Sequence, residues 1–215
     1  MKESVRRAIT GNKIIAIARG VEPELIIDAA QALYEGGIRL LEVTFDQSAQ
    51  KGESHTARMI SALREKFGDK MTIGAGTVIT AEQADEAAEA GAQFLLSAVV
   101  GGEVIARGNE LGLVTIPGAL TPSEIQQAHD FGADFVKLFP AGQLGPGYFK
   151  AVRAPLSNIP LIAVGGIDEN NLRDYLAAGA VGVGVGSCLV NNNLIRQKRF
   201  DELTAMAKAY VSLIK

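Results

Sequence analysis

The sequence predicts an α/β protein, a single-domain (β/α)8 barrel of the TIM type with an extra helix at the N-terminus. Eight short apolar runs rich in β-branched residues recur along the 215 residues, and helix-like segments separate them. The starts of successive runs lie about 20 to 33 residues apart, which leaves room for one helix and two loops. No linker or low-complexity tract divides residues 1–215. An open doubly wound sheet is the competing architecture, and eight units favour the closed barrel.

The predicted elements follow one another in a regular strand–helix order. The predicted strands are Lys13–Ala18, Ile38–Thr44, Met71–Gly74, Gln93–Ser97, Leu113–Pro117, Asp134–Phe139, Pro160–Val164 and Val181–Val185. Predicted helices between them include Glu22–Tyr34, Glu53–Lys66, Ala81–Glu89 and Pro122–Phe131. The amphipathic stretch Lys2–Thr10 predicts the extra helix, and Phe200–Ile214 predicts the helix that closes the barrel.

Glycine turns and capping residues mark the ends of these helices. A helix, a glycine and an apolar run follow one another in EGGIRLLEV, EAGAQFLLS, ELGLVTIP, DFGADFVKL and AAGAVGVGV. Glycine is suited to this position because it adopts the left-handed conformation that ends a helix. Thr80 and Thr121 precede Gln83 and Glu124 by three residues, which is the spacing of a capping box.

Composition excludes several classes of partner. A net charge of −3 and an aromatic content of 6% give no electrostatic or stacking footprint for nucleic acid. No apolar run approaches the ~18 residues of a membrane span, and the N-terminus lacks the apolar segment of a signal peptide. A single cysteine, Cys188, excludes an intrachain disulfide and fits a reducing compartment. We therefore expect a cytoplasmic protein that binds neither nucleic acid nor membrane.

Charged residues on two predicted strands are the main chemical signal. Lys137 lies in an otherwise apolar segment, where burial lowers the pKa of an ammonium and makes it a nucleophile able to form a Schiff base. A lysine that reaches solvent at a strand end is the alternative. Glu42 lies on the second predicted strand, opposite the sixth, so the two side chains can meet at the carboxyl ends of the strands. A purely structural ion pair is possible there, but this end of a barrel carries the active site, which favours catalysis.

Glycines after the last two predicted strands form a second pattern. The seventh strand ends in Gly165-Gly166, and the eighth ends in Gly186-Ser187. Loops at these positions of a barrel often bind phosphate through backbone N–H groups, and a serine hydroxyl can add to them. Tight strand–helix turns are the alternative explanation for the glycines.

Metal and nucleotide chemistry find little support. The only histidines, His55 and His129, fall in separate helix-like segments and are expected to be solvated, whereas Cys188 is expected to be a small buried residue. The chain has neither a P-loop nor a G-x-G-x-x-G motif. We therefore expect no metal and no cofactor, which leaves amine catalysis on a carbonyl group.

A set of motifs now gives a resemblance to a known family. In order, the chain contains LEVT (41–44), GAGTV (74–78), GAQF (91–94), IPG (116–118), KLFPA (137–141), GGI (165–167) and GS (186–187). Across residues 13–190 it resembles the 2-keto-3-deoxy-6-phosphogluconate (KDPG) and 4-hydroxy-2-oxoglutarate (KHG) aldolases. The resemblance implies a metal-free class I aldolase on a homotrimeric barrel. Its substrate would be a 2-keto acid phosphate, cleaved to pyruvate and glyceraldehyde 3-phosphate, and 4-hydroxy-2-oxoglutarate could be cleaved to pyruvate and glyoxylate.

The same resemblance implies roles for individual residues. Lys137 matches the Schiff-base lysine and Glu42 the acid/base glutamate. The other matching positions bind substrate or line its pocket: Arg19, Thr77, Phe139, Gly165, Gly166, Gly186 and Ser187.

Three positions depart from the commonest family pattern. Asp46 stands where many members have an arginine that grips the pyruvyl carboxylate, while Ala98 and Val164 replace a proline and a threonine. These changes leave the particular 2-keto-3-deoxy acid and its C4 stereochemistry open. Two other functions also remain open, a phosphosugar isomerase or epimerase with Glu42 as its base, and a non-catalytic binder of phospho-keto acids.

Overall fold

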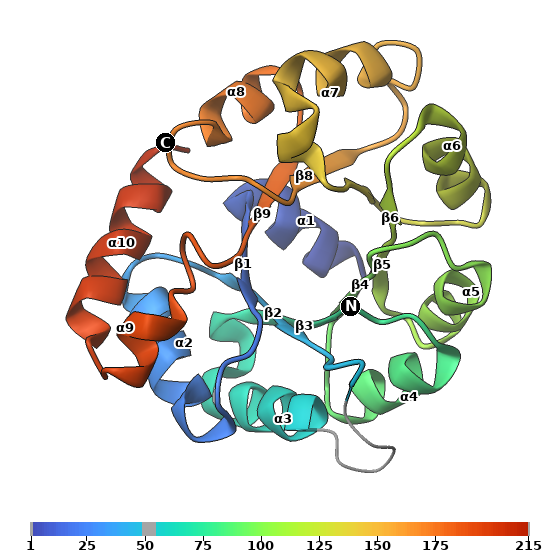
Figure 1. Cartoon of the computed structure of the whole chain (residues 1–215). Helices are drawn as coiled ribbons and strands as arrows, with labels where there is room; N and C mark the ends of the chain where they lie inside the picture. Colours follow the sequence, from blue (N-terminus) through green and yellow to red (C-terminus); the bar gives the residue numbers. More distant parts are fainter. Residues whose placement is uncertain (1, 49–54, 215) are drawn as a thin grey trace.

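The computed structural model describes residues 2–48 and 55–214, and it confirms the predicted barrel (Figure 1). The strands are β1 Ile14–Ala18, β2 Leu40–Thr44, β3 Thr72–Gly76, β4 Phe94–Leu96, β5 Val114–Ile116, β6 Gly118–Ala119, β7 Val136–Leu138, β8 Leu161–Val164 and β9 Gly182–Val185. They form one sheet in the order β5-β4-β3-β2-β1-β9-β8-β7-β6, and its paired strands are parallel. Helices surround this ring on all sides in Figure 1.

The helices alternate with the strands. They are α1 Lys2–Asn12, α2 Ile26–Glu35, α3 His55–Phe67, α4 Ala81–Glu89, α5 Gly102–Glu110, α6 Pro122–Asp130, α7 Gly145–Arg153, α8 Leu172–Ala177, α9 Asn192–Arg196 and α10 Phe200–Ser212. The first two residues of the predicted helix Glu53–Lys66 lie outside the described residues. In the part of the chain that is described, no helix combines the length and the apolar character needed to cross a membrane.

One short strand in the ring was not predicted. The predicted strand Leu113–Pro117 is present as β5, which ends at Ile116, and the additional strand β6 begins after Pro117. Proline has no N–H to give to a neighbouring strand, which explains the break. β5 pairs with β4 and β6 pairs with β7, while the Pro117 carbonyl accepts a hydrogen bond from the Lys137 N–H at 2.9 Å. The two short strands therefore join the ends of the sheet and close the barrel.

The signals for helix ends are confirmed. One glycine in each of the five predicted turns has a positive φ angle: Gly37, Gly91, Gly112, Gly132 and Gly179. Thr80 and Thr121 both cap their helices, and Thr121 forms the complete capping box with Glu124. Local sequence thus sets where each strand begins after its helix.

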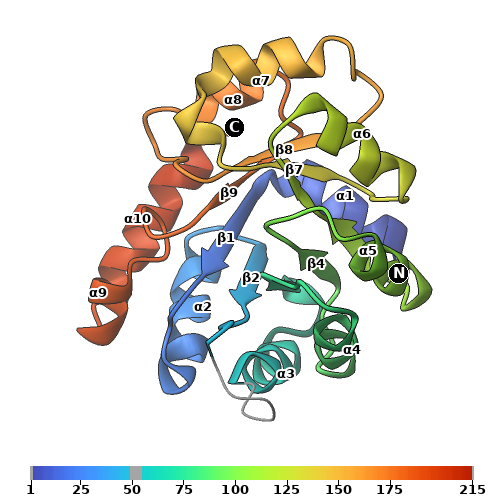
Figure 2. The ribbon, with the colours of Figure 1, turned by 45° about the vertical axis from the view of Figure 1, so that its right-hand side comes forward.

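The extra helix α1 closes one end of the barrel. Its Val5 and Ile9 are buried in one cluster with residues that face the inside of the ring, such as Ile15 and Phe94. A second, larger cluster fills the space between the ring and the outer helices. Figure 2 shows α1 against the ring, where it contacts β2, β5 and β9. The carboxyl ends of the strands lie at the opposite end and form the open face.

Candidate active site

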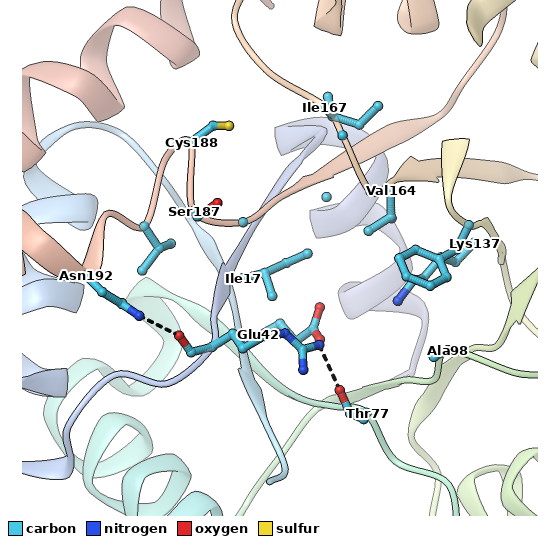
Figure 3. A pocket seen from close by; sticks show the side chains of 17 residues that line it. Ile17, Glu42, Thr77, Ala98, Lys137, Val164, Ile167, Ser187, Cys188 and Asn192 are labelled. Atoms are coloured by element: carbon cyan, nitrogen blue, oxygen red, sulfur yellow. Dashed lines mark hydrogen bonds between the residues drawn. The ribbon is translucent and has the colours of Figure 1, made fainter. Parts of the chain in front are cut away.

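A cavity of about 740 Å³ lies at the open face, and all nine predicted site residues line it (Figure 3). They are Arg19, Glu42, Thr77, Lys137, Phe139, Gly165, Gly166, Gly186 and Ser187. They come from the ends of six strands or from the loops that follow them. A barrel brings such distant segments together because all its strands end on the same face.

Lys137 on β7 and Glu42 on β2 lie on opposite sides of the ring and point towards one another (Figure 3). Only 5% of Lys137 and 1% of Glu42 is exposed. Space for Glu42 depends on Gly76 of β3, because a Cβ atom there would overlap the Glu42 carboxylate. The second glycine of the GAGTV motif thus makes room for the Glu42 side chain.

Burial shifts the protonation of both groups towards neutrality. Loss of solvent raises the pKa of the Glu42 carboxyl. The positive charges of Lys137 and Arg19 act in the opposite direction but are the smaller effect. Loss of solvent also lowers the pKa of the Lys137 ammonium, which Glu42 opposes and Arg19 reinforces. The Lys137 Nζ lies 4.6 Å from the centre of the Phe139 ring. Among the described residues, nothing forms a hydrogen bond with the buried Glu42 Oε2. A lysine nucleophile and a carboxyl group able to exchange protons therefore face the same cavity.

Arg19 and Thr77 form the polar edge beside this pair. The Arg19 Nη2 donates to the Thr77 Oγ1 at 3.0 Å, and the Gln47 Nε2 donates to the Thr77 carbonyl at 2.8 Å. Thr77 has a φ of 57°, an unusual conformation for a β-branched residue that these contacts help to hold. The partner of the guanidinium is a neutral hydroxyl, which leaves the charge of Arg19 available to a carboxylate of a ligand.

Asp46 does not take part in this edge. Its Oδ1 accepts from the Ser48 N–H at 2.9 Å and from the Ser48 hydroxyl at 2.7 Å, and these bonds lower the pKa of its carboxyl. Asp46 is exposed and is not among the residues that line the cavity. The Asp46 side chain therefore turns into its own loop and away from the cavity.

The loop after β8 presents glycines with φ angles of 88° at Gly165 and 76° at Gly166. Their carbonyls are already engaged: Gly165 O accepts from the Gly142 N–H at 2.7 Å, and Gly166 O accepts from the Asn171 Nδ2 at 2.8 Å. A Cβ atom at Gly165 would lie 3.0 Å from the Phe139 ring. Tying back the carbonyls leaves the N–H groups of this loop for an anion.

The loop after β9 has the same design. The Gly186 carbonyl accepts from the N–H groups of Leu189 at 2.9 Å and Val190 at 2.8 Å. The Ser187 side chain lines the cavity beside the loop after β8 (Figure 3). Two loops with engaged carbonyls and a hydroxyl group therefore meet at one side of the cavity, where they suit an anionic group such as phosphate.

Several residues that line the cavity were not predicted from the sequence. The expectation that Cys188 is buried is wrong, because the thiol is exposed and lines the cavity. Leu189, the next residue, is the one that enters the core. The other lining residues that were not predicted are Ile17, Ile167, Gly184, Val190 and Asn192, whereas Ala98 and Val164, two of the departures from the family pattern, also line the cavity. Strand alternation could have found Ile17, two residues before Arg19, but no pattern marks Asn192.

The histidines lie away from the cavity. His55 is exposed at the start of α3, and His129 is partly buried near the end of α6. Across residues 2–48 and 55–214, no three His, Cys, Asp or Glu side chains gather closely enough to hold a metal ion.

Comparisons with known sequences agree on one family. The family described as "KDPG and KHG aldolase" matches residues 5–206. The 2-dehydro-3-deoxy-6-phosphogalactonate aldolase of Escherichia coli K12 is 35% identical over 198 residues, which cover 92% of this chain and 94% of that protein. A 2-dehydro-3-deoxy-phosphogluconate aldolase of Treponema pallidum is 34% identical over 212 residues, 98% of each chain.

Solved structures show the same likeness. A structure described as native KDPGal superimposes with a TM-score of 0.82 at 34% identity, covering 94% of this chain and 95% of that one. A KDPG aldolase from Legionella pneumophila, with pyruvate captured as a covalent carbinolamine intermediate, gives a TM-score of 0.85 at 29% identity. That match covers 95% of this chain and 97% of the other.

Proposed function

Because the chain belongs to the KDPG and KHG aldolase family, we propose that it is a class I aldolase that cleaves a 2-keto-3-deoxy-6-phospho sugar acid. The products are pyruvate and glyceraldehyde 3-phosphate. The observation that carries this proposal is the buried pair of Lys137 and Glu42, facing one another in the cavity.

The mechanism begins at the Lys137 amine. It attacks the C2 ketone to give a carbinolamine, and Glu42 donates the proton with which the hydroxyl leaves as water. The resulting protonated imine accepts the electron pair of the C3–C4 bond. Glu42 takes the proton of the C4 hydroxyl as that bond breaks, so glyceraldehyde 3-phosphate leaves. Protonation of the enamine at C3 and hydrolysis of the imine then release pyruvate and restore Lys137.

The two ends of the cavity suit the two ends of this substrate. Arg19, with Thr77 beside it, binds the carboxylate next to the ketone. The loops that contain Gly165 and Gly166, and Gly186 and Ser187, bind the phosphate through N–H groups and a hydroxyl. Relatives are named for both the gluconate-derived and the galactonate-derived phosphate, so both are candidate substrates.

A pyruvate-release assay tests this activity. Each C4 epimer, with and without its 6-phosphate, is incubated with the enzyme, and pyruvate is followed with lactate dehydrogenase. We expect release from at least one phosphorylated epimer, a much higher KM without the phosphate, and no release by Lys137→Ala. An isomerase, an epimerase or a mere binder would release no pyruvate from any of them.

The family resemblance also supports a homotrimer. Large apolar side chains are exposed in loops that follow neighbouring strands of the ring: Ile79, Val99, Leu120 and Leu144. Exposed apolar patches commonly mark protein–protein contacts. These side chains therefore support association into a homotrimer. The single free cysteine, in turn, is consistent with a protein that works in the reducing cytoplasm.

A further inference from the structure

Asn192 connects two segments of the cavity wall that are far apart in sequence. It is the first residue of α9, and its Nδ2 donates to the Arg19 carbonyl at 2.9 Å and to the Gly20 carbonyl at 3.3 Å. The dashed line from Asn192 in Figure 3 marks the shorter bond. These contacts join the start of α9 to the loop after β1, across 173 residues of chain.

The orientation of this amide has a cost. With Nδ2 turned to two carbonyls, the Asn192 Oδ1 is buried, and no described residue donates to it. An unsatisfied buried acceptor destabilises the fold, so a residue kept for stability alone would be a poor choice here. The neighbouring asparagines differ: Asn191 caps α9 through its side chain, and Asn193 is exposed.

Arg19 is consequently held at two points. Thr77 holds its guanidinium, and Asn192 holds its backbone. Arg19 itself is exposed and follows the last residue of β1, so the strand alone does not fix its direction. The ion pair of Arg196 with Glu22 at 2.8 Å also links α9 to this loop, but it is solvent-exposed and contributes little.

We propose that Asn192 is a positioning residue for carboxylate recognition, which it serves by fixing the backbone of Arg19. The proposal rests on the proposed function, in which Arg19 binds the substrate carboxylate and Lys137 forms the Schiff base. Without the Asn192 amide, Arg19 loses its backbone anchor, and a misplaced guanidinium weakens binding of the carboxylate but not of the ketone.

Trapping at Lys137 with borohydride separates these two effects. The half-saturating concentration is measured for pyruvate and for pyruvamide, which has the same ketone but no carboxylate. We expect Asn192→Ala to raise the value for pyruvate about fivefold or more and to leave the value for pyruvamide within about twofold. Asn193→Ala, an asparagine on the same turn of α9, is the matched control and should change neither.

A double-mutant cycle locates the effect at Arg19. In an Arg19→Ala background, adding Asn192→Ala should no longer change the half-saturating concentration of pyruvate, because the guanidinium that Asn192 positions is already absent. An undiminished effect in that background would overturn the proposal, and so would equal shifts for pyruvate and pyruvamide. The thermal midpoint of Asn192→Ala should stay close to that of the parent protein. If that variant does not fold, Asn192→Ser keeps a polar side chain that is too short for both carbonyls, and the same shifts are expected.

The outcome distinguishes this proposal from the proposed function. If the parent protein forms no adduct with pyruvate, the aldolase mechanism itself fails. If the parent protein forms the adduct and Asn192→Ala has the same half-saturating concentrations for pyruvate and pyruvamide, only the role of Asn192 is wrong.

Discussion

At the scale of single residues, the site depends on two opposite charges that have lost nearly all contact with solvent. Lys137 would prefer to be neutral at this depth, and so would Glu42, although each partly stabilises the charge of the other. Their pKa values move towards one another, which makes proton transfer between them easier. Burial thus favours a neutral amine on Lys137 and a carboxyl group on Glu42 that can give and take protons.

Glu42→Gln should separate the two roles of this pair. Cleavage should fall about a hundredfold or more, because the group that moves protons is lost. The negative charge of Glu42 raises the pKa of Lys137, so its removal should lower that pKa further. The pH dependence of Lys137 acetylation by acetic anhydride measures this directly, and its midpoint should move to lower pH. A midpoint that stays or rises would contradict the coupling.

Gly76→Ala tests how tightly Glu42 is placed. The added Cβ atom would overlap the carboxylate of Glu42, so the side chain must move and cleavage should fall about tenfold or more. Gly147→Ala is a control, since a Cβ atom there meets nothing within 4 Å, and its activity should equal that of the parent protein. Steady-state kinetics of both variants decide the matter.

Strand alternation explains which of these residues could be predicted. Lys137 and Glu42 stand in apolar runs, which indicate strands buried on both faces. Alternation then shows which neighbours share a face with each of them, and the barrel architecture places that face at the site. Cys188 lies in the loop after β9, and Asn192 begins the short helix α9. Neither segment has a repeating hydrophobic pattern from which the direction of a side chain could be predicted. The position of Asn192 depends on tertiary contacts with the loop after β1, which a local pattern does not contain.

At the scale of elements, one buried acid, Asp134, adds a polar attachment of α1 to the barrel beside the apolar contacts of Val5 and Ile9. The Asp134 Oδ2 accepts from the Thr115 N–H at 2.9 Å and pairs with the Lys2 Nζ at 2.9 Å. Arg6 lies 3.6 Å from the other oxygen. This cluster stands just before β7, at the end of the ring that α1 covers. It helps to close the ring without contributing to the cavity.

Asp134→Asn should therefore affect stability and not catalysis. The variant keeps the shape of the side chain but loses the charge that both cations contact, which should lower the free energy of unfolding by about 1 kcal/mol. Urea unfolding measures this loss. The KM and kcat of cleavage should remain within about twofold of the parent values, and a large fall in kcat would show that the two ends of the barrel are coupled.

The short strand β6 shows the limit of predicting single elements. The apolar run Leu113–Pro117 predicts β5, but Gly118 and Ala119 lie beyond that run, and only their pairing with β7 identifies them as a strand. The sequence shows that Pro117 has no N–H to donate, but it does not show which neighbouring strand would have accepted that hydrogen bond. Helix ends were predictable because glycine and threonine act on their own turn.

At the scale of the whole molecule, the barrel has one closed and one open end. α1 fills the end at the start of the strands, and the cavity occupies the other. The exposed apolar side chains of Val99 and Leu120 lie in loops of the open end, beside the cavity. Association of chains through this rim would place the sites close to the interface.

Val99→Asp combined with Leu120→Asp should dissociate the proposed trimer. Association would bury the two new carboxylates in an apolar contact, where they lose their solvation, so the trimer should not form. Light scattering should give the mass of one chain for this variant and of three chains for the parent protein. Arg7→Asp, on the exposed side of α1, is the control and should remain trimeric. A parent protein with the mass of one chain would rule out the trimer.

Peptide mapping after borohydride reduction in the presence of pyruvate shows whether Lys137 forms the covalent intermediate. We expect a stable reduced pyruvyl group on the peptide that contains Lys137, and its loss in Lys137→Ala. An adduct on another lysine, or no adduct on the parent protein, would rule out Lys137 as the Schiff-base residue.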